Sequence, residues 1–495
     1  MRDGRQYISS LKDGRTVYID GKKVSDVTSH PAFRGIVDTI AGMYDFSANP
    51  GNGMICETGW GTKGNKIYMI PTSLEELLER HEAIEKLAAQ TAGFVGRGPD
   101  HVGGFLAGFA GNKSRFAGGA RHFERNVVDF YRKVVDQDLY VTYAIVPPQT
   151  DKTKAAHEKS NRFSQVGVSS ENGSGIVVKG AQMLATGGAV SDYVFVSCIH
   201  PLKQGDEDYA ISFVVPSNAK GLKFHCRRSY ASGKPSTFDY PLSTRFDESD
   251  AFLVFDDVFI PWEDVFVFRN VALMHDQFFE TPAHVLGNNQ AQIRLLVKLK
   301  FILGIARKVA GMNGSDRIPG VIEKLGEMAS LVSIIEGMVV SSECRGMVRP
   351  EGVFSPNPRF LYGAIALQSE LYPRVLHLLR DISGAGILQL PSSFEDLFNP
   401  ETSGDLSRYI VSPNNTSEER IKLFKLAWDI VGSEFAGRHY QYEMFYAGAP
   451  FIAKSYAFWN YGFDEVEDFV DDFMSKYDFR SGSKQADGKA GKKGS

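Results

Sequence analysis

Cysteine is scarce in this chain, with four residues among 495. The four lie far apart, at Cys56, Cys198, Cys226 and Cys344, so no CxxC pair is present, and a zinc ribbon or a thioredoxin-type motif is excluded. Four cysteines in so long a chain do not form a disulfide framework, and they indicate reduced thiols. We therefore expect a cytoplasmic protein whose core forms without disulfides.

Excess charge and long apolar runs are lacking as well. The 55 Lys and Arg residues against 59 Asp and Glu residues leave a formal net charge of −4, which argues against broad nucleic-acid binding, because such binding requires a basic surface. No apolar run approaches the roughly 20 residues that cross a bilayer, and residues 1–15 are too polar for a secretory signal. The sequence thus predicts no nucleic-acid partner and no membrane partner.

Sequence motifs for nucleotides, metals and hydrolysis are also missing. Residues 59–64, GWGTKG, match GxGxxG, but a dinucleotide-binding fingerprint needs a strand before it and a helix after it. Here an irregular segment precedes the motif and a strand-like run follows, so we reject that interpretation. The chain contains no GxxxxGK[ST], HExxH or GxSxG, and it predicts no metal site.

What the chain contains is a globular composition, 43% hydrophobic and 12% aromatic, in which the apolar spacing changes twice. Helical spacing is clearest over residues 73–91, where we expect Ser73 to be the N-cap and Glu76 to complete a capping box. Strand-like runs of β-branched and aromatic residues follow at 139–146, 175–186, 193–199, 209–216 and 252–261. Helical spacing returns over 289–310, 320–344, 360–384 and 417–435.

This order predicts four segments: a mainly helical N-terminal domain over 1–138, a β-sandwich or small β-barrel over 139–268, a helical bundle over 269–479, and a disordered tail over 480–495. A β-domain between two helical parts is the layout of the acyl-CoA dehydrogenase-like flavoproteins. By that analogy we expect an α+β chain with an acyl-CoA dehydrogenase-like fold.

The segment 97–101, RGPDH, contains residues suited to phenol chemistry. Arg97 and His101 stand four residues apart across a Pro-containing turn, and if Asp100 caps a helix the two side chains can share a pocket. Arginine binds a phenolate or a carboxylate, and histidine exchanges a proton near neutral pH. Taken alone, these residue types favour a solvent-exposed turn.

Two further segments lie at strand ends. In 143–152, YAIVPPQTDK, a strand stops at two prolines, and a polar loop follows whose side chains can bind a ligand, although the loop alone favours a surface turn. In 255–266, FDDVFIPWEDVF, a strand ends at Pro261 and returns the chain to the helical part, which is a structural pattern.

Together these segments resemble the large-component 4-hydroxyphenylacetate 3-monooxygenase family, which includes phenol, chlorophenol and nitrophenol hydroxylases. The resemblance runs almost end to end, through residues 4–35, RGPDH, IVPPQTDKTK, FDDVFIPWEDVF, KLKFILGIA and SGAGILQLPS. It implies that a separate NAD(P)H-dependent flavin reductase supplies FADH2. The reduced FAD reacts with O2 to give a C4a-hydroperoxyflavin, which hydroxylates a phenolic or other electron-rich aromatic ring. The family also implies the acyl-CoA dehydrogenase-like fold and a homotetramer.

The resemblance extends to site residues. Arg97 and His101 hold catalytic and substrate-binding positions, where His101 resembles the chlorophenol branch, and Cys198 and Ile199 border the substrate. The implied flavin contacts are Tyr143, Ala144, Ile145, Gln149, Thr150, Asp151, Lys152, Thr186, Ala449, Pro450, Phe451 and Ile452.

Two positions depart from the family pattern. Tyr143 stands where the family usually has a histidine; it can hydrogen-bond a peroxide or phenol oxygen, but with a reference pKa of ~10 it is a poor base. His101 or His284 is then the candidate base, and Asn289 replaces a second common histidine. These departures leave the substrate open among phenols, halo- and nitrophenols and electron-rich heteroaromatic rings.

Three alternatives remain. An enzyme like 4-hydroxybutyryl-CoA dehydratase needs an iron–sulfur cluster with cysteines near RGPDH, whereas no cysteine lies between Cys56 and Cys198. An acyl-CoA dehydrogenase-like oxidase would hold oxidised FAD tightly. A non-catalytic scaffold would oxygenate no phenol.

Overall fold

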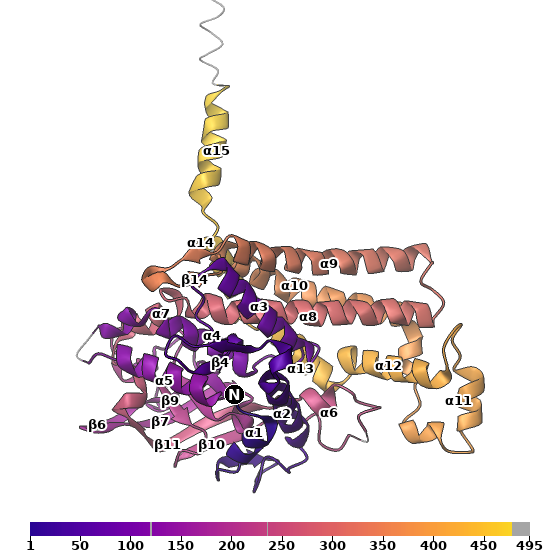
Figure 1. Ribbon diagram of the computed structural model, residues 1–495, viewed down its shortest axis with the longest axis horizontal. Helices are drawn as coiled ribbons and strands as arrows, with labels where there is room; N and C mark the ends of the chain where they lie inside the picture. The colour runs from indigo at the N-terminus through magenta and orange to yellow at the C-terminus, as the bar shows by residue number, and fades with distance from the viewer. Residues whose placement is uncertain (119–120, 235, 478–495) are drawn as a thin grey trace, which may run out of the picture.

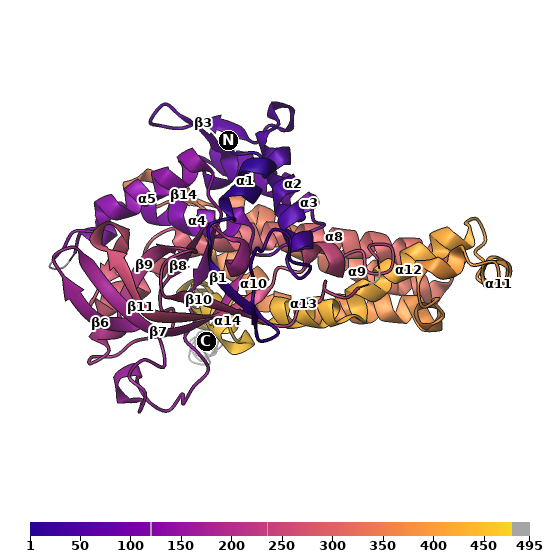
Figure 2. The same ribbon diagram turned by 90° about the horizontal axis from the view of Figure 1, so that it is seen from below.

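The computed structural model describes residues 1–118, 121–234 and 236–477, so the predicted disordered tail at 480–495 lies outside the described residues. The sheets and the N-terminal helices form one end of the molecule, and the long C-terminal helices extend away from them (Figures 1 and 2). Buried apolar side chains from all these parts form one large cluster. The parts therefore share a core.

The N-terminal part is mainly helical, as the sequence predicts. Its helices are α1 (Gly4–Ser10), α2 (Arg34–Ala48), α3 (Leu74–Ala89), α4 (Pro99–Ala110) and α5 (Glu124–Gln137), and its strands are β1 (Thr16–Ile19), β2 (Lys22–Lys23), β3 (Ile55–Glu57) and β4 (Lys63–Asn65). The GxGxxG match at 59–64 falls in the antiparallel β3–β4 hairpin. It is no dinucleotide-binding turn.

Helix α3 begins where the sequence predicts, but the expected capping box is incomplete. Ser73 is the N-cap, and its hydroxyl accepts the backbone N–H of Glu76. The Glu76 carboxylate accepts hydrogen bonds from both the backbone N–H (2.7 Å) and the hydroxyl (2.8 Å) of Thr72. The N–H and the hydroxyl of Thr72 thus occupy the Glu76 carboxylate, which a capping box would instead bond to the Ser73 N–H.

The central part forms two sheets, with strand orders β2-β1-β10-β11-β7-β6 and β12-β9-β8-β5. The strands are β5 (Val141–Ala144), β6 (Gly167–Asn172), β7 (Gly175–Thr186), β8 (Tyr193–Val196), β9 (Ile211–Pro216), β10 (Leu222–Cys226), β11 (Asp250–Pro261) and β12 (Val265–Phe268), with the short helix α6 (Ser243–Phe246) before β11. Each predicted strand run overlaps one of them. Strand β1 pairs with β10, so N-terminal residues complete the larger sheet, and the domain boundary at 138 remains a prediction.

The C-terminal part is a helical bundle. Its helices are α7 (Val271–Phe279), α8 (Ala283–Met312), α9 (Pro319–Cys344), α10 (Pro358–Ser383), α11 (Ser403–Tyr409), α12 (Ser417–Val431), α13 (Glu434–Met444), α14 (Pro450–Trp459) and α15 (Phe463–Ser475), with a small hairpin of β13 (Met347–Val348) and β14 (Phe354–Ser355). The prediction of a single helix over 417–435 is wrong at its C-terminal end. It stops at Gly432, and α13 starts anew because the Ser433 hydroxyl caps it by accepting the N–H of Ala436.

Helix α8 carries polar side chains into the interior. It packs against α3, α4, α9, α10 and α12, and every residue from Ala283 to Leu296 is buried. His284, Gln290 and Arg294 are therefore buried near α4 and α13, where they meet the residues described next.

Candidate active site

The RGPDH segment is buried. Arg97 is 8% exposed and His101 is 1% exposed, so the interpretation as a solvent-exposed turn is wrong. Gly98 is the N-cap of α4, Pro99 is its first residue, and Asp100 lies inside the helix instead of capping it. Arg97 lies just outside the helix, and one nitrogen of its guanidinium contacts His101 Nε2, so the two side chains share one pocket.

Glu248 holds the start of this turn. Its Oε1 accepts the backbone N–H groups of Gly96 (2.9 Å) and Arg97 (2.7 Å). The hydroxyl of Tyr140 donates to the carbonyl oxygen of Arg97 (2.6 Å), and Arg438 on α13 donates to Glu248 Oε2 (3.1 Å). Because Glu248 lies just before β11, all three parts of the chain contribute to the position of Arg97.

Three tyrosine rings surround the Arg97 guanidinium. Its Cζ lies 4.9 Å from the ring centre of Tyr143, 5.5 Å from that of Tyr442 and 4.2 Å from that of Tyr446. It also donates a hydrogen bond to the Tyr446 hydroxyl (2.8 Å). In the described structure its side-chain partners are Tyr446 and His101, which are uncharged groups, so the cation keeps its attraction for an anion such as a phenolate.

His101 is a neutral imidazole in this pocket. Burial and the nearby Arg97 cation hold the pKa of His101 well below its usual value. Its Nδ1 lies 3.1 Å from Gln290 Oε1 and 3.1 Å from the Tyr446 hydroxyl. A neutral imidazole has one unprotonated nitrogen, and that nitrogen can accept the proton of a phenol.

Tyr143 lies on β5 beside both residues. Its ring centre is 5.3 Å from that of His101, and the two rings meet edge to face. Burial raises the pKa of Tyr143 above its usual value, although Arg97 opposes this shift. At neutral pH its phenol is therefore protonated and suits hydrogen-bond donation, as the sequence indicates.

His284, the other candidate base, has different partners. Its Nδ1 lies 2.8 Å from the Tyr362 hydroxyl, and burial lowers the pKa of His284 to about 3. The Phe105 ring lies near both histidines, with ring centres 5.3 Å from His101 and 6.2 Å from His284. The structure thus brings Arg97, His101 and Tyr143 into contact and places His284 against Phe105.

Asn289, which replaces a family histidine, and the expected substrate residues Cys198 and Ile199 have partners outside this contact group. Asn289 donates to Glu343 (2.8 Å), and it belongs to a contact with α9. Cys198 is buried after β8, and burial raises the pKa of its thiol to about 12, which fits a wall residue better than a nucleophile. Ile199 is half-buried and bonds through its N–H to the Ile145 carbonyl (2.9 Å), next to the end of β5.

The expected flavin contacts divide into a buried and an exposed group. Ala144, Ile145 and Thr186 are buried, and the Thr186 hydroxyl donates to Asp250 (2.6 Å). The exposed or partly exposed group is Gln149, Thr150, Asp151, Lys152, Ala449, Pro450, Phe451 and Ile452.

One buried acceptor fits a flat cofactor with polar edges. Gln182 Nε2 donates to the carbonyls of Ser197 (2.6 Å) and Ala144 (3.4 Å), whereas its Oε1 has no partner in the described structure. An unmet buried acceptor costs about 1–3 kcal/mol, and an N–H of an isoalloxazine ring would satisfy it. The exposed polar residues 149–152, which follow β5, suit the rest of a dinucleotide.

The residues of this site that are not predicted from the sequence include Tyr140, Glu248, Gln290, Arg438, Tyr442 and Tyr446. The available signal for Tyr446 is its place in FYAG, directly before the loop expected to contact flavin. Gln290 and Glu248 reach the site only because α8 and the segment before β11 pack against α4 and its turn.

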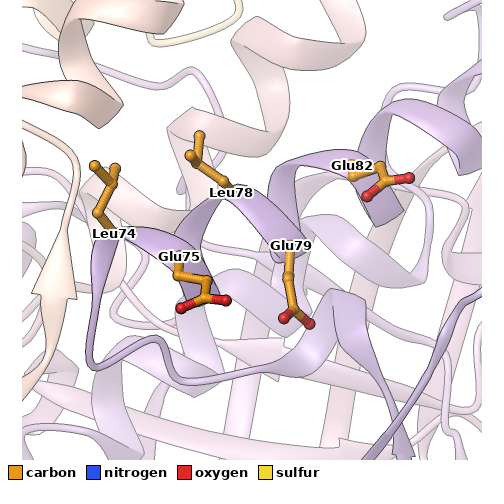
Figure 3. Close-up of a pocket in the computed structure, with 5 residues that line it drawn as sticks. All are labelled: Leu74, Glu75, Leu78, Glu79 and Glu82. Atoms are coloured by element: carbon orange, nitrogen blue, oxygen red, sulfur yellow. The ribbon is translucent and has the colours of Figure 1, made fainter.

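A shallow hollow of about 540 Å³ on α3 is separate from this site (Figure 3). It is lined by Leu74, Glu75, Leu78, Glu79 and Glu82. Glu79 is paired with Lys66 (2.8 Å), Glu82 is paired with Lys86 (2.8 Å), and Leu78 is 42% exposed. We assign no chemistry to this hollow because its carboxylates are neutralised or face solvent.

The chain matches two family models in sequence. The model described as 4-hydroxyphenylacetate 3-hydroxylase N terminal matches residues 3–267, and the one described as 4-hydroxyphenylacetate 3-hydroxylase C terminal matches residues 274–475. The 4-hydroxyphenylacetate 3-monooxygenase oxygenase component of Pseudomonas aeruginosa is 36% identical over 90% of this chain and 86% of that protein. The oxygenase component of a Rhodococcus 4-nitrophenol 2-monooxygenase is 34% identical over 96% of this chain and 92% of that one.

Solved structures agree with these matches. The oxygenase component of a 4-hydroxyphenylacetate 3-monooxygenase, in complex with FAD and 4-hydroxyphenylacetate, has a TM-score of 0.91 and 32% identity, and covers 96% of this chain and 99% of that one. A 4-hydroxybutyryl-CoA dehydratase from N. maritimus shares the fold, with a TM-score of 0.88 at 20% identity. The predicted α+β, acyl-CoA dehydrogenase-like fold is confirmed.

Proposed function

Because this chain belongs to the 4-hydroxyphenylacetate 3-hydroxylase family, we propose that its Arg97 pocket binds and hydroxylates a phenol. The chain is the oxygenase component of a flavin-dependent aromatic monooxygenase, and it uses FAD and O2. The observation that supports the phenol pocket is the contact of the buried Arg97 and His101 with the partly buried Tyr143, in which a cation, a neutral base and a hydrogen-bond donor meet.

Each of these side chains suits one part of phenol binding. Arg97 would stabilise negative charge on the phenol oxygen, because its positive charge has no carboxylate partner among the side-chain contacts of the described structure. His101 would take the phenol proton, and Tyr143 would donate a hydrogen bond. An ionised phenol is the better nucleophile, so holding this charge in a water-poor pocket favours oxygenation of the ring.

The flavin would lie along β5 and the loop after it. We propose Tyr143, Ala144, Ile145, Thr186, residues 149–152 and Ala449–Ile452 as its contacts. Reduced FAD, when bound, supplies the activated oxygen. The chain's own contribution is to bury the reacting end, since Arg97 and His101 are 8% and 1% exposed. Such a pocket protects the oxygen donor from water.

A separate reductase supplies the reduced flavin, as the designation "oxygenase component" of the relatives implies. We propose that this partner is an NAD(P)H-dependent flavin reductase and that both proteins are cytoplasmic. Among the described residues, α9 is the one helix that is long and apolar enough to cross a membrane. It packs against α8 and α10 in the bundle through a buried face that holds Met328, Val332, Ile335 and Val339.

The function is tested with the purified chain, an unrelated flavin reductase, NADH, FAD and O2. We expect hydroxylation of at least one member of a panel of phenol, chlorophenols, nitrophenols and 4-hydroxyphenylacetate, measured as product per O2 consumed. The chain should bind FADH2 more tightly than oxidised FAD and purify nearly colourless. Stoichiometric bound yellow flavin, together with no product from any phenol, would instead favour an acyl-CoA dehydrogenase-like oxidase.

We also propose that the chain forms a homotetramer. Helix α15 projects away from the rest of the chain (Figure 1), and its apolar side chains Phe469, Val470, Phe473 and Met474 are exposed, as are Ile322, Ile334 and Val340 on α9. Exposed apolar surface of this extent indicates a protein partner, and a second copy of the chain offers the same surface.

Light scattering provides the test of assembly. The intact protein should have about four times the mass of one chain, and a chain that ends at Asn460, before α15, should form smaller assemblies. A monomeric intact protein would contradict the proposal.

A further inference from the structure

Hydrogen bonds lead from the Asp100 carboxylate to Arg97 through two intervening side chains. Gln290 Nε2 lies 2.8 Å from Asp100 Oδ2, and Gln290 Oε1 lies 3.1 Å from His101 Nδ1. His101 Nε2 then contacts the Arg97 guanidinium. All four side chains are buried, so water does not compete for these contacts.

The charges at the two ends set the direction of every bond between them. An ionised carboxylate can only accept, so Gln290 presents its NH2 group to Asp100 and its oxygen to His101. An amide oxygen can only accept, which requires a proton on His101 Nδ1. A guanidinium can only donate, which requires a lone pair on His101 Nε2. Both ends therefore require the same form of the imidazole.

We propose that Asp100 and Gln290 are positioning residues that hold His101 in its neutral Nδ1–H form, with the Nε2 lone pair directed toward Arg97 and the phenol oxygen. Neither residue would touch substrate. Both would act through the ring of His101.

The surroundings of Asp100 keep it available as an anion. Burial raises the pKa of Asp100 to about 6, although the hydrogen bond from Gln290 and the charge of Arg80 oppose this shift, so the carboxylate is mostly ionised at neutral pH. Arg80 is fully buried, and Gly104 admits its guanidinium, because a Cβ at position 104 would lie only 2.8 Å from Arg80 Nη2. This cation lies against the helix that carries Asp100.

The Nδ1–H form matters most when a phenol occupies the pocket. The substrate oxygen would then take hydrogen bonds from Arg97, and Gln290 Oε1 and the Tyr446 hydroxyl would remain the contacts at His101 Nδ1. As the phenol O–H bond breaks, an Nε2–H bond forms, and the resulting imidazolium is still held at Nδ1. This step rests on the proposed function, whereas the tautomer of the resting protein does not.

Nitrogen NMR measures the tautomer directly. The intact protein labelled with ¹⁵N-histidine contains 11 histidines, and the signals that disappear in His101→Gln belong to His101. We expect one protonated nitrogen, Nδ1, and one unprotonated nitrogen, Nε2, in the resting protein at pH 7. In Gln290→Leu the Nδ1 signal should shift because its acceptor is lost, while Arg97 still requires the Nε2 lone pair. When Arg97→Ala is added to Gln290→Leu, a mixture of tautomers or the Nε2–H form should appear. An imidazolium or an Nε2–H form in the unaltered protein would overturn the proposal, and so would unchanged His101 signals in Gln290→Leu.

Exchanging the two functional groups tests the direction of the hydrogen bonds. Gln290→Glu alone places two carboxylates together, and it should lower product formation by about 100-fold, as expected when a positioned base is lost. Adding Asp100→Asn restores the order of donor and acceptor, because an asparagine NH2 group can donate to the new carboxylate, which accepts from Nδ1–H. The double variant should recover most of the activity. If it is no more active than Gln290→Glu, the assigned direction is wrong.

Gln292→Leu is the matched control. Gln292 lies on the same helix, is fully buried and donates one amide hydrogen bond to Gln368 (2.7 Å). Its loss should lower stability as Gln290→Leu does, while the His101 signals stay as in the unaltered protein. A change of the His101 signals in Gln292→Leu as large as that in Gln290→Leu would assign the effect to general loosening and overturn the proposal.

Discussion

Arg97→Ala should lower hydroxylated product by about 100-fold, because oxyanion-stabilising donors contribute about 10²–10³ to turnover. Arg97 offers a positive charge together with the donors that contact His101 and Tyr446. Without it, the phenol would be held less well in its reactive ionised form, and reduced flavin would still consume O2. Most of the O2 should therefore appear as H2O2, which is measured beside product and O2 uptake.

Two further variants separate the role of Arg97 from a general loss of structure. Arg97→Lys keeps the charge but cannot reproduce the planar contacts of a guanidinium. Its product yield should therefore fall between that of the unaltered chain and that of Arg97→Ala. Arg125→Ala removes an arginine that is 87% exposed and paired with Asp129, so it should behave as the unaltered chain. An unchanged product yield per O2 in folded Arg97→Ala would show that Arg97 does not hold the substrate.

Glu443→Gln should destabilise the protein by about 3–5 kcal/mol, the cost of breaking a buried ion pair. The Glu443 carboxylate bonds Arg294 through both oxygens (2.8 and 2.9 Å), Lys298 (2.8 Å) and Gln368 (2.7 Å). All of these side chains are buried. The variant would leave the two cations without their carboxylate. The midpoints of urea unfolding and of thermal unfolding should therefore be lower than in the unaltered chain.

Glu434→Gln is the control on the same helix. Glu434 is 45% exposed and pairs with Arg228, itself 73% exposed, at 3.0 Å. Surface pairs of this kind contribute about 0–1 kcal/mol, so the midpoints should barely move. Equal losses in the two variants would contradict the importance assigned to the buried cluster.

The same cluster predicts a dependence of stability on pH. Burial alone would raise the pKa of Glu443, but the attraction of Arg294 and Lys298 outweighs it and lowers the pKa from 4.5 to about 2. A carboxylate with a lowered pKa in the folded state stabilises the protein above its unfolded pKa, and this contribution is lost as the pH falls from 4.5 toward 2. Thermal midpoints measured over that window should fall less in Glu443→Gln than in the unaltered chain.

Patterns close in sequence predicted the elements that position the site. The strand runs and the long helices follow from apolar spacing, and Ser73 caps α3 as expected. The segment RGPDH marked Arg97 and His101, because the turn brings the two side chains near each other over only four residues. Neighbouring residues determine such features, so a single sequence reveals them.

Tertiary packing decided the rest of the site. Residue types favour an exposed turn for RGPDH, yet Glu248 and Arg438, about 150 and 340 residues further along, hold it inside the molecule. The sequence did not indicate Gln290 as a neighbour of His101, because a buried glutamine in an apolar helix has no periodicity that names its partner. Tyr446 reaches Arg97 across 349 residues.

By itself, the sequence determined the order of helical and β-strand segments, the absence of a nucleotide-binding fingerprint, and the pairing of an arginine with a histidine at one turn. Only the tertiary structure decided that this pair is buried, that His101 is neutral and hydrogen-bonded to Gln290, and that His284 contacts Tyr362 instead. The physical reason is that protonation and hydrogen-bond direction depend on burial and on charges from distant segments. Spacing along the chain records neither of them.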